Sequence, residues 1–231
     1  MRFWLLISAL LVATPASAWR PASPGIRVQA LPDEAGHVFE LDLTKVRLEA
    51  AKAPKDRGAT AKELAAGRSA LLAVNGGYFD PKMRSLGLLV SNGKQLNPLR
   101  RADWGVMTVN LQGRARLTHT RDHKRTKATE FAIQAGPRLL VAGKPTSLKP
   151  QWARRTALGI LKANPYKLLL IVTKRSVSLM QLAEMFQTLG CDYALNLDGG
   201  SSTQLWADKS VSNVAPVDGV RVANALLVTA R

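Results

Sequence analysis

Apolar residues cluster in short runs along this chain, and most runs have the length of a β-strand rather than of a helix. The runs that predict strands are 26–31, 37–43, 46–50, 70–74, 86–90, 106–110, 115–120, 131–134, 156–161, 167–173, 192–197 and 222–229. The turns Asn92-Gly93 and Gln112-Gly113 each separate two runs. They predict hairpins, because Asn-Gly in particular adopts the backbone that a type I′ turn requires.

Two segments carry convincing helix signals. Thr60-Ala-Lys-Glu63 has the pattern of a capping box at the start of a short helix that Gly67 ends. Ser178-Leu-Met-Gln181 repeats that pattern, and apolar residues then recur at helical spacing until Gly190. The strand–helix–strand unit within 167–197 predicts a single parallel crossover.

This pattern of many short strands, several hairpin turns and few helices indicates an α+β fold. We expect a single domain over residues 19–231, with a mixed, largely antiparallel β-sheet core and few helices. Two stretches lack periodicity: the Pro-rich segment 19–25 and the basic stretch 121–127, which is predicted to be a solvated loop. No internal repeat or long linker divides the chain.

The first 18 residues have the organisation of a secretory signal peptide. Arg2 precedes an apolar stretch from Phe3 to Ala13, and Ala16-Ser17-Ala18 is a small-residue cleavage pattern. The apolar stretch is shorter than the roughly 20 residues that span a bilayer. An uncleaved N-terminal anchor is the alternative. We expect cleavage near Ala18 and a periplasmic or secreted protein.

The charge balance favours anionic partners. The chain has 33 Lys and Arg against 16 Asp and Glu, a formal net charge of +17. A glycosyl-phosphate or acidic glycan substrate fits this excess, as does peripheral contact with an anionic membrane surface. Aromatic residues make up only 6% of the chain and no known stacking motif occurs, so we expect no nucleic-acid partner. The single Cys191 excludes an intramolecular disulfide and a CxxC site.

Two segments far apart in the chain share one design. In AVNGGYFD (73–80) an apolar strand ends in Asn75 and two glycines follow. In NLDGGSST (196–203) a strand delivers Asp198 to a Gly-Gly turn with hydroxyl groups beyond it. Paired glycines let backbone N–H groups converge on an anionic oxygen, although either pair alone would also suit a tight turn. Two such loops predict one shared site.

Five segments then identify a family. They are AVNGGYFD (73–80), QAGPRLL (134–140), RRTALGI (154–160), LAEMFQTLGCDYALNLDGGSSTQLW (182–206) and VANALLV (222–228). Together, over about residues 40–230, they resemble the phosphodiester glycosidase family. This family includes the enzyme that uncovers mannose 6-phosphate on lysosomal glycoproteins. The resemblance implies hydrolysis of a sugar–phosphate diester at the anomeric carbon, which releases the sugar and leaves a phosphomonoester. It does not specify the sugar or the aglycone.

Three residues are expected to carry that chemistry. Asp198 is the candidate nucleophile, or the base that activates water; the alternative is an Asx-turn residue that fixes its loop. Asn75, the second expected catalytic residue, would bind a sugar hydroxyl or orient Asp198. Arg155 is expected to bind the phosphate, because a guanidinium matches phosphate oxygens bidentately; a surface arginine is the alternative. Phosphate is a good leaving group. Stabilising the negative charge on the departing phosphate therefore matters more than protonating it with a strong general acid.

The other expected substrate-binding residues lie in the two loops and in neighbouring strands. They are Gly76, Gly77, Tyr78, Gln134, Gly199, Gly200, Ser201, Ser202 and Asn224. The sequence requires no cofactor, although Asp80, Asp198 and nearby carbonyls could collect a divalent cation such as Ca²⁺ or Mg²⁺. The alternative function is a non-catalytic module that binds anionic envelope glycans or lipid headgroups.

Overall fold

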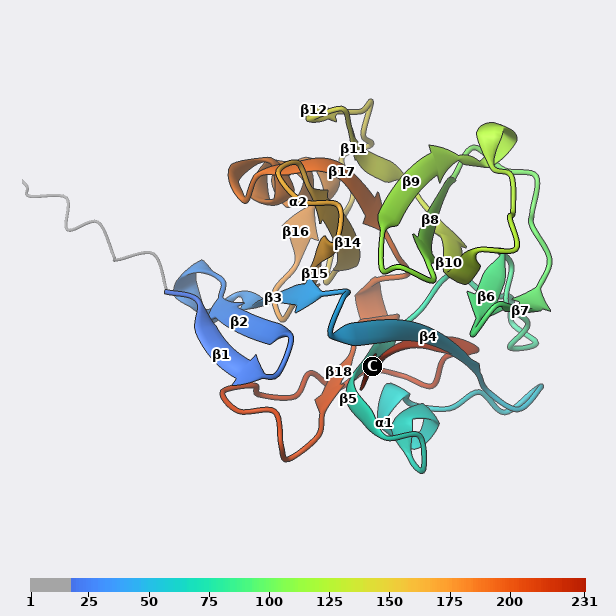
Figure 1. Ribbon diagram of the computed structural model, residues 1–231, viewed down its shortest axis with the longest axis horizontal. Helices are drawn as coiled ribbons and strands as arrows, with labels where there is room; N and C mark the ends of the chain where they lie inside the picture. Colours follow the sequence, from blue (N-terminus) through green and yellow to red (C-terminus); the bar gives the residue numbers. More distant parts are fainter. Residues whose placement is uncertain (1–17) are drawn as a thin grey trace, which may run out of the picture.

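Three antiparallel sheets form most of the part of the chain that the structure describes. This computed structural model describes residues 18–231, so the predicted signal peptide, apart from Ala18, lies outside the described residues. Figure 1 shows the strands of the three sheets around the middle of the molecule. The eight-stranded sheet has the order β1 (Arg20–Ser23), β2 (Ile26–Ala30), β3 (Gly36–Asp42), β15 (Lys167–Thr173), β14 (Thr156–Leu161), β17 (Cys191–Asn196), β11 (Arg138–Val141) and β12 (Lys144–Pro145).

Two smaller sheets, of five and four strands, pack with the eight-stranded sheet. The five-stranded sheet has the order β7 (Lys94–Asn97), β6 (Leu89–Ser91), β10 (Thr129–Ala135), β8 (Gly105–Asn110) and β9 (Ala115–His119). The four-stranded sheet has the order β18 (Leu205–Ala207), β5 (Ala70–Asn75), β19 (Asn224–Ala230) and β4 (Val46–Lys52). A separate short pair joins β13 (Trp152–Ala153) to β16 (Val177–Ser178). Every strand pairing in residues 18–231 is antiparallel.

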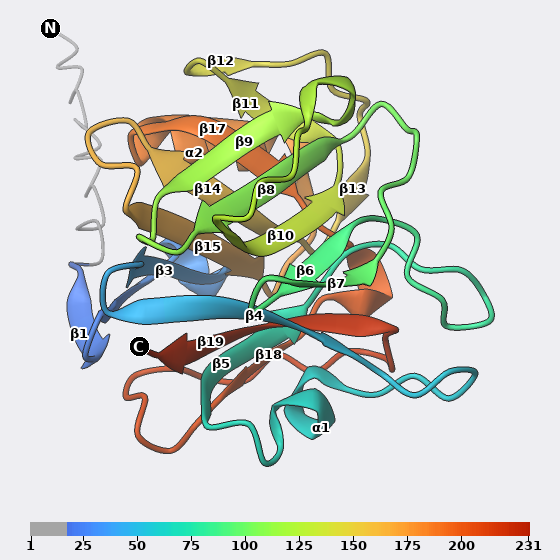
Figure 2. The ribbon, with the colours of Figure 1, turned by 45° about the vertical axis from the view of Figure 1, so that its right-hand side comes forward.

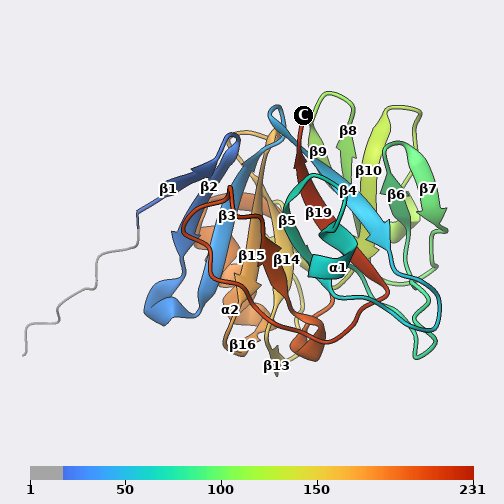
Figure 3. The same cartoon turned by 90° about the horizontal axis from the view of Figure 1, so that it is seen from below.

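One hydrophobic core lies between the sheets, and two helices cover outer faces. The sheets stand side by side in Figure 3, and Figure 2 shows the five-stranded sheet packed across β14 and β15. Phe39, Leu72 and Phe131 come from different sheets and are fully buried in this core. Helix α2 (Leu179–Thr188) packs Phe186 on the eight-stranded sheet, and α1 (Ala61–Ala65) covers the four-stranded sheet. The α+β prediction is confirmed.

The local signals for helices and hairpins are also confirmed. At α1, the Thr60 hydroxyl accepts from the Glu63 N–H at 3.2 Å, and the Glu63 carboxylate accepts from the Thr60 N–H at 2.9 Å. The matching bonds of the second capping box, at the start of α2, are both 3.0 Å. Asn92 and Gly93 have φ values of 48° and 73°, as a type I′ turn between β6 and β7 requires. No helix of residues 18–231 has the length and apolar character needed to cross a membrane.

Two expectations need correction. Strands β15 and β17 run in the same direction and α2 connects them, but β14 lies between them and pairs antiparallel with both. The crossover therefore exists without a parallel pairing. The Pro-rich segment 19–25 was predicted to lack regular structure, and this is wrong: Arg20–Ser23 forms β1 against β2. Pro21 fits there because β1 is an edge strand, which has no second neighbour to bond.

Strand ends from two sheets meet at one edge of the molecule, and this positions the site. The chain leaves β17 beside the start of β14, where the Leu197 N–H donates to the Thr156 carbonyl at 2.9 Å. It leaves β5 beside the start of β19, where the Gly76 N–H donates to the Asn224 carbonyl at 3.0 Å. Both Gly-Gly loops therefore begin at the same place.

Candidate active site

The two Gly-Gly loops are hydrogen-bonded to each other. The Asp198 N–H donates to the Gly76 carbonyl at 3.1 Å, and the Asn75 side-chain amide donates to the Asp198 carbonyl at 2.6 Å. These bonds join residues more than a hundred positions apart in the chain. The sheet architecture thus brings Asp198, Asn75 and Gly76 into one cluster.

The side chain of Asn75 is fully buried, and it forms its hydrogen bonds with other residues of the protein. Its Oδ1 accepts from the Thr156 hydroxyl at 2.6 Å and from the Gln204 N–H at 3.2 Å. Together with the bond to Asp198, these contacts tie β5, β14 and the 198–204 segment together. Asn75 therefore holds the backbone of Asp198 in place, which is the second of the two roles expected for it.

The side chain of Asn224 holds the first loop through hydrogen bonds to the backbone of Gly77. Its Oδ1 accepts from the Gly77 N–H at 2.7 Å, and its Nδ2 donates to the Gly77 carbonyl at 3.1 Å and to Ser85 Oγ at 3.0 Å. A Cβ atom on Gly76 would lie 2.1 Å from Asn224 Oδ1. Gly76 is needed because Asn224 occupies the space where a side chain would stand.

The Asp198 carboxylate, in contrast, is bound mainly by its own turn. Its Oδ1 accepts from the Gly199 N–H at 2.9 Å, and the residue is only partly buried. Burial raises the pKa of this carboxyl above its ordinary value, although hydrogen bonds from Ser202 and Gly199 oppose the rise. A carboxylate with a raised pKa and spare acceptor capacity is suited to acid–base or nucleophilic work.

Backbone donors of the second loop are partly occupied. The Gly200 N–H donates to the Arg154 carbonyl at 2.8 Å, and the Ser202 N–H donates to the Gly199 carbonyl at 3.3 Å. Ser201 is the exposed residue of this turn, whereas Ser202 is buried. Ser201 is thus the member of the turn best placed to meet a ligand.

Arg155 lies buried beneath the second loop, with an exposed fraction of only 6%. Its Cδ would lie 3.8 Å from a Cβ on Gly199, and its guanidinium donates to the carbonyls of Gln151 and Val177. None of the ion pairs in residues 18–231 involves Arg155. Burial lowers the pKa of this guanidinium, which shows the cost of desolvating an unpaired cation. An anionic ligand would remove that cost.

A cleft of about 600 Å³ opens next to this cluster. Tyr78 and Gln151 line it. Tyr78 donates its hydroxyl hydrogen bond to the Gly136 carbonyl, accepts one from Asn196 at 3.3 Å, and packs its ring 5.0 Å from that of Trp104. Burial and then the Asp198 charge raise the pKa of Tyr78. Neither Asp198 nor Arg155 is among the residues that line the cleft, but Gln151 on its wall accepts a hydrogen bond from Arg155.

The side chain of Gln134 contacts the 88–100 segment rather than the two Gly-Gly loops. Its side chain is buried, with Oε1 accepting from the N–H groups of Leu88 and Arg100 and Nε2 donating to the Arg100 carbonyl. It has no bond to either Gly-Gly loop through its side chain. Gln134 organises the 88–100 segment beside the cleft.

Asp80 likewise has its carboxylate engaged within its own loop. It pairs with Arg84 at 2.6 Å, which lowers the pKa of Asp80. Among residues 18–231, no three His, Cys, Asp or Glu side chains gather in a way that could hold a metal ion. The divalent cation near Asp80 and Asp198 stays a prediction.

Several site residues were missed from the sequence. Thr156 and Gln204 hold Asn75, Asn196 holds Tyr78, and Trp104 packs on Tyr78. Asn196 carried a usable signal, because it is a polar residue at the buried end of a strand two positions before Asp198. Trp104 carried none, since it lies in an irregular segment.

Comparisons with known proteins fit this geometry. The profile of the phosphodiester glycosidase family matches residues 68–229, which include both Gly-Gly loops, Arg155 and Asn224. The chain belongs to this family. A search of curated proteins finds no match.

Solved structures of similar fold come from distant relatives. The catalytic domain of zebrafish N-acetylglucosamine-1-phosphodiester alpha-N-acetylglucosaminidase, auto-inhibited by its pro-peptide, has a TM-score of 0.70 and 19% identity, covering 95% of this chain and 85% of that one. A hypothetical protein from Synechocystis has a TM-score of 0.71 and 16% identity, and covers 89% of this chain. The chain spans 62% of the Synechocystis protein's length. At these identities the likeness establishes the fold of a phosphodiester glycosidase.

Proposed function

We propose that this protein hydrolyses the glycosidic bond of a sugar-1-phosphodiester, releasing the free sugar and a phosphomonoester. Two observations carry the proposal. The carboxylate of Asp198 keeps spare acceptor capacity. The side chain of Arg155, a buried cation with no ion-pair partner in the described residues, lies beside Gly199, the next residue in the chain after Asp198. A glycosyl phosphate supplies an electrophilic anomeric carbon for the first and an anion for the second.

Each residue has a distinct part in the reaction. In one route Asp198 removes a proton from the water that attacks the anomeric carbon. In the other, its carboxylate attacks that carbon, and water then hydrolyses the glycosyl ester to release the sugar and restore the carboxylate. The bond between that carbon and the phosphate oxygen breaks, and the electron pair leaves with the phosphate. Arg155 stabilises the charge that grows on the departing group, so no strong general acid is needed. Asn75 and Asn224 position the two loops without touching the substrate.

The choice of first substrate follows from the zebrafish relative. Its name states that it acts on N-acetylglucosamine 1-phosphodiesters. We extend that class to this chain as a proposal, and include glucose, galactose and mannose 1-phosphodiesters beside it. Residues 1–18 favour action in the periplasm or outside the cell, where acidic glycans and anionic membrane surfaces would suit the basic surface.

The test is incubation of the full-length protein with methyl phosphodiesters of these sugar 1-phosphates in ¹⁸O-labelled water. Phosphorus and proton NMR then follow methyl phosphate and free sugar. The proposal predicts both products, with the label in the sugar, because the carbon–oxygen bond breaks. Label in the phosphate would indicate a phosphodiesterase, and binding without any turnover would indicate a non-catalytic module. Either result would overturn the proposal.

A further inference from the structure

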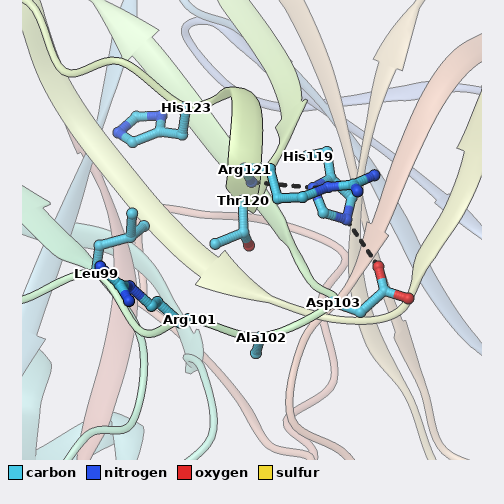
Figure 4. A pocket seen from close by; sticks show the side chains of 8 residues that line it. All are labelled: Leu99, Arg101, Ala102, Asp103, His119, Thr120, Arg121 and His123. Atoms are coloured by element: carbon cyan, nitrogen blue, oxygen red, sulfur yellow. Dashed lines mark hydrogen bonds and ion pairs between the residues drawn. The ribbon is translucent and has the colours of Figure 1, made fainter.

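A second hollow of about 680 Å³ lies beside the cleft, between the segment 99–103 and the turn that follows β9. Figure 4 shows the side chains around it, with Arg101 and Thr120 on either side and Asp103 at one end. Asp103 also lines the cleft next to Tyr78 and Trp104. The two hollows therefore meet at Asp103.

Asp103 is fixed in this position by a buried histidine. His119 Nε2 lies 2.8 Å from Asp103 Oδ1, and His119 Nδ1 accepts from the Arg121 N–H at 3.0 Å. Because Nδ1 is an acceptor, Nε2 carries the proton and donates it to the carboxylate. The hydrogen bond from His119 is the main cause that lowers the pKa of Asp103, and the charges of Arg138 and Arg121 lower it further. The lowered pKa favours the carboxylate form of Asp103, which lies at the border between the two hollows.

Positive charge predominates on both sides of this border. Arg101 and Arg121 line the second hollow, and Lys149 lines the cleft. Asp103 is the only acidic residue among those that line the two hollows. None of these three cations forms an ion pair with an acidic side chain in residues 18–231. The second hollow thus has a net positive lining, because the single carboxylate of Asp103 offsets only part of the charge of Arg101 and Arg121.

We infer that the second hollow binds a further anionic group of the substrate, in the part that lies beyond the scissile phosphate. Arginine guanidinium groups favour phosphate or carboxylate oxygens through charge-assisted bonds. The inference rests on the proposed function and narrows it: the substrate class is a glycosyl phosphodiester whose aglycone carries a second phosphate. Arg101 and Arg121 recognise that phosphate and act as specificity-determining residues, with no part in bond cleavage.

Two substrates that differ only in this second phosphate test the inference. One is N-acetylglucosamine 1-(glycerol phosphate), and the other carries 3-phosphoglycerol in place of glycerol. The wild-type protein is expected to prefer the phosphorylated aglycone by roughly tenfold or more in kcat/KM, since a charge-assisted bond contributes at least that much. The preference should shrink as salt is raised. The double variant Arg101→Gln/Arg121→Gln should remove it, while activity on the glycerol ester stays unchanged.

Arg68→Gln is the matched control, because Arg68 is an exposed arginine in the turn after α1 and is not among the residues that line either hollow. It should keep the full preference. Equal kcat/KM values for the two substrates in the wild-type protein would overturn the inference and leave the proposed function standing. Loss of the preference in Arg68→Gln would overturn it too, because the effect would then come from overall charge.

A binding measurement separates failure of the inference from failure of the proposed function. If neither ester is hydrolysed, calorimetry with inorganic tripolyphosphate at physiological ionic strength decides. The inference predicts that the double variant binds this probe at least about tenfold more weakly than the wild type and Arg68→Gln. Equal affinities in all three proteins would overturn it.

Discussion

The two Gly-Gly loops have nearly the same sequence pattern, yet the structure uses them differently. In the first loop, Asn75, Gly76 and Gly77 are buried, and every side-chain contact of Asn75 is to the protein. In the second loop, Asp198, Gly199 and Gly200 are partly exposed, and the carboxylate binds only within its own turn. The first loop supports the backbone of the second loop, and the second loop carries the carboxylate that remains available to a ligand.

This difference shows what distinguishes a reactive polar residue from a structural one. Both Asn75 and Asp198 follow an apolar strand and precede two glycines. The side chain of Asn75 forms three hydrogen bonds within the protein, which hold β14 and the second loop in place. Asp198 keeps acceptor capacity and sits near an unpaired buried arginine. The number of satisfied hydrogen bonds, rather than the motif, separates the two roles.

The strongest way to break the comparison is to remove the support. Asn75→Ala should lower the free energy of unfolding by about 3 kcal/mol or more, because the Thr156 hydroxyl, the Gln204 N–H and the Asp198 carbonyl lose partners inside the protein. Urea denaturation measures this. The control is Asn164→Ala, which removes a surface-turn bond to the Tyr166 N–H and should cost less than about 1 kcal/mol. Similar costs for both variants would show that Asn75 is not a support.

Gly76 of the first loop should tolerate a side chain less well than Gly200 of the second loop. Gly76→Ala places a Cβ where Asn224 Oδ1 lies 2.1 Å away, so we expect a loss of about 2 to 3 kcal/mol in the same assay. The Asn224 clamp on Gly77 would have to open. A Gly76→Ala protein with wild-type stability would mean that Asn224 does not hold this loop.

Gly200→Ala is the change chosen for comparison in the second loop, and its effect should be smaller. No atom lies within 4 Å of the position of the new Cβ, so only the left-handed backbone with φ of 65° is disfavoured. That costs about 1 kcal/mol. A cost equal to that of Gly76→Ala would remove the contrast between the loops.

The smallest expected effect is the pH dependence of stability at Asp198. Burial raises the pKa of this carboxyl, so the native state binds its proton more tightly than the unfolded state does. The stability of the wild type therefore falls as pH rises from the ordinary carboxyl value of 3.8 through the raised native value. Asp198→Asn has no carboxyl group that titrates at this position. The stability of the variant, relative to that of the wild type, should therefore be greatest near pH 7 and decline in acid. Thermal unfolding at several pH values measures the difference, and the opposite trend would show that Asp198 is stabilised as a carboxylate.

Local sequence signals predicted much of the fold. Capping boxes at Thr60 and Ser178 and the Asn92-Gly93 turn depend on neighbouring residues, so the chain itself contains the information. The insertion of β14 between β15 and β17 depends on which distant edge each strand meets, and periodicity does not report that. Strand β1 was missed for the same reason, because its only partner is β2 and its own pattern is irregular.

The candidate site was predictable in part. The sequence predicted that the loops at Asn75 and Asp198 meet, and they do. It did not reveal that the side chain of Asn75 is buried and bound by three other parts of the protein, since those partners come from other elements. The sequence alone is equally compatible with an exposed Arg155, and the structure shows that this side chain is buried. Nothing in the sequence marks Asp103, because it lies in an irregular segment and its partner His119 is in another element.

The central claim is that Asp198 reacts, and its direct test compares Asp198→Asn with Asp208→Asn. Asp208 also forms a turn of its own, through the Ser210 N–H at 2.9 Å, so it controls for an aspartate that merely fixes a loop. The measurement is the rate of sugar release from N-acetylglucosamine 1-(methyl phosphate), with substrate affinity determined by calorimetry. We predict that Asp198→Asn lowers the rate by at least about 10³-fold with little change in affinity, and that Asp208→Asn matches the wild type. Wild-type turnover by Asp198→Asn would contradict the account.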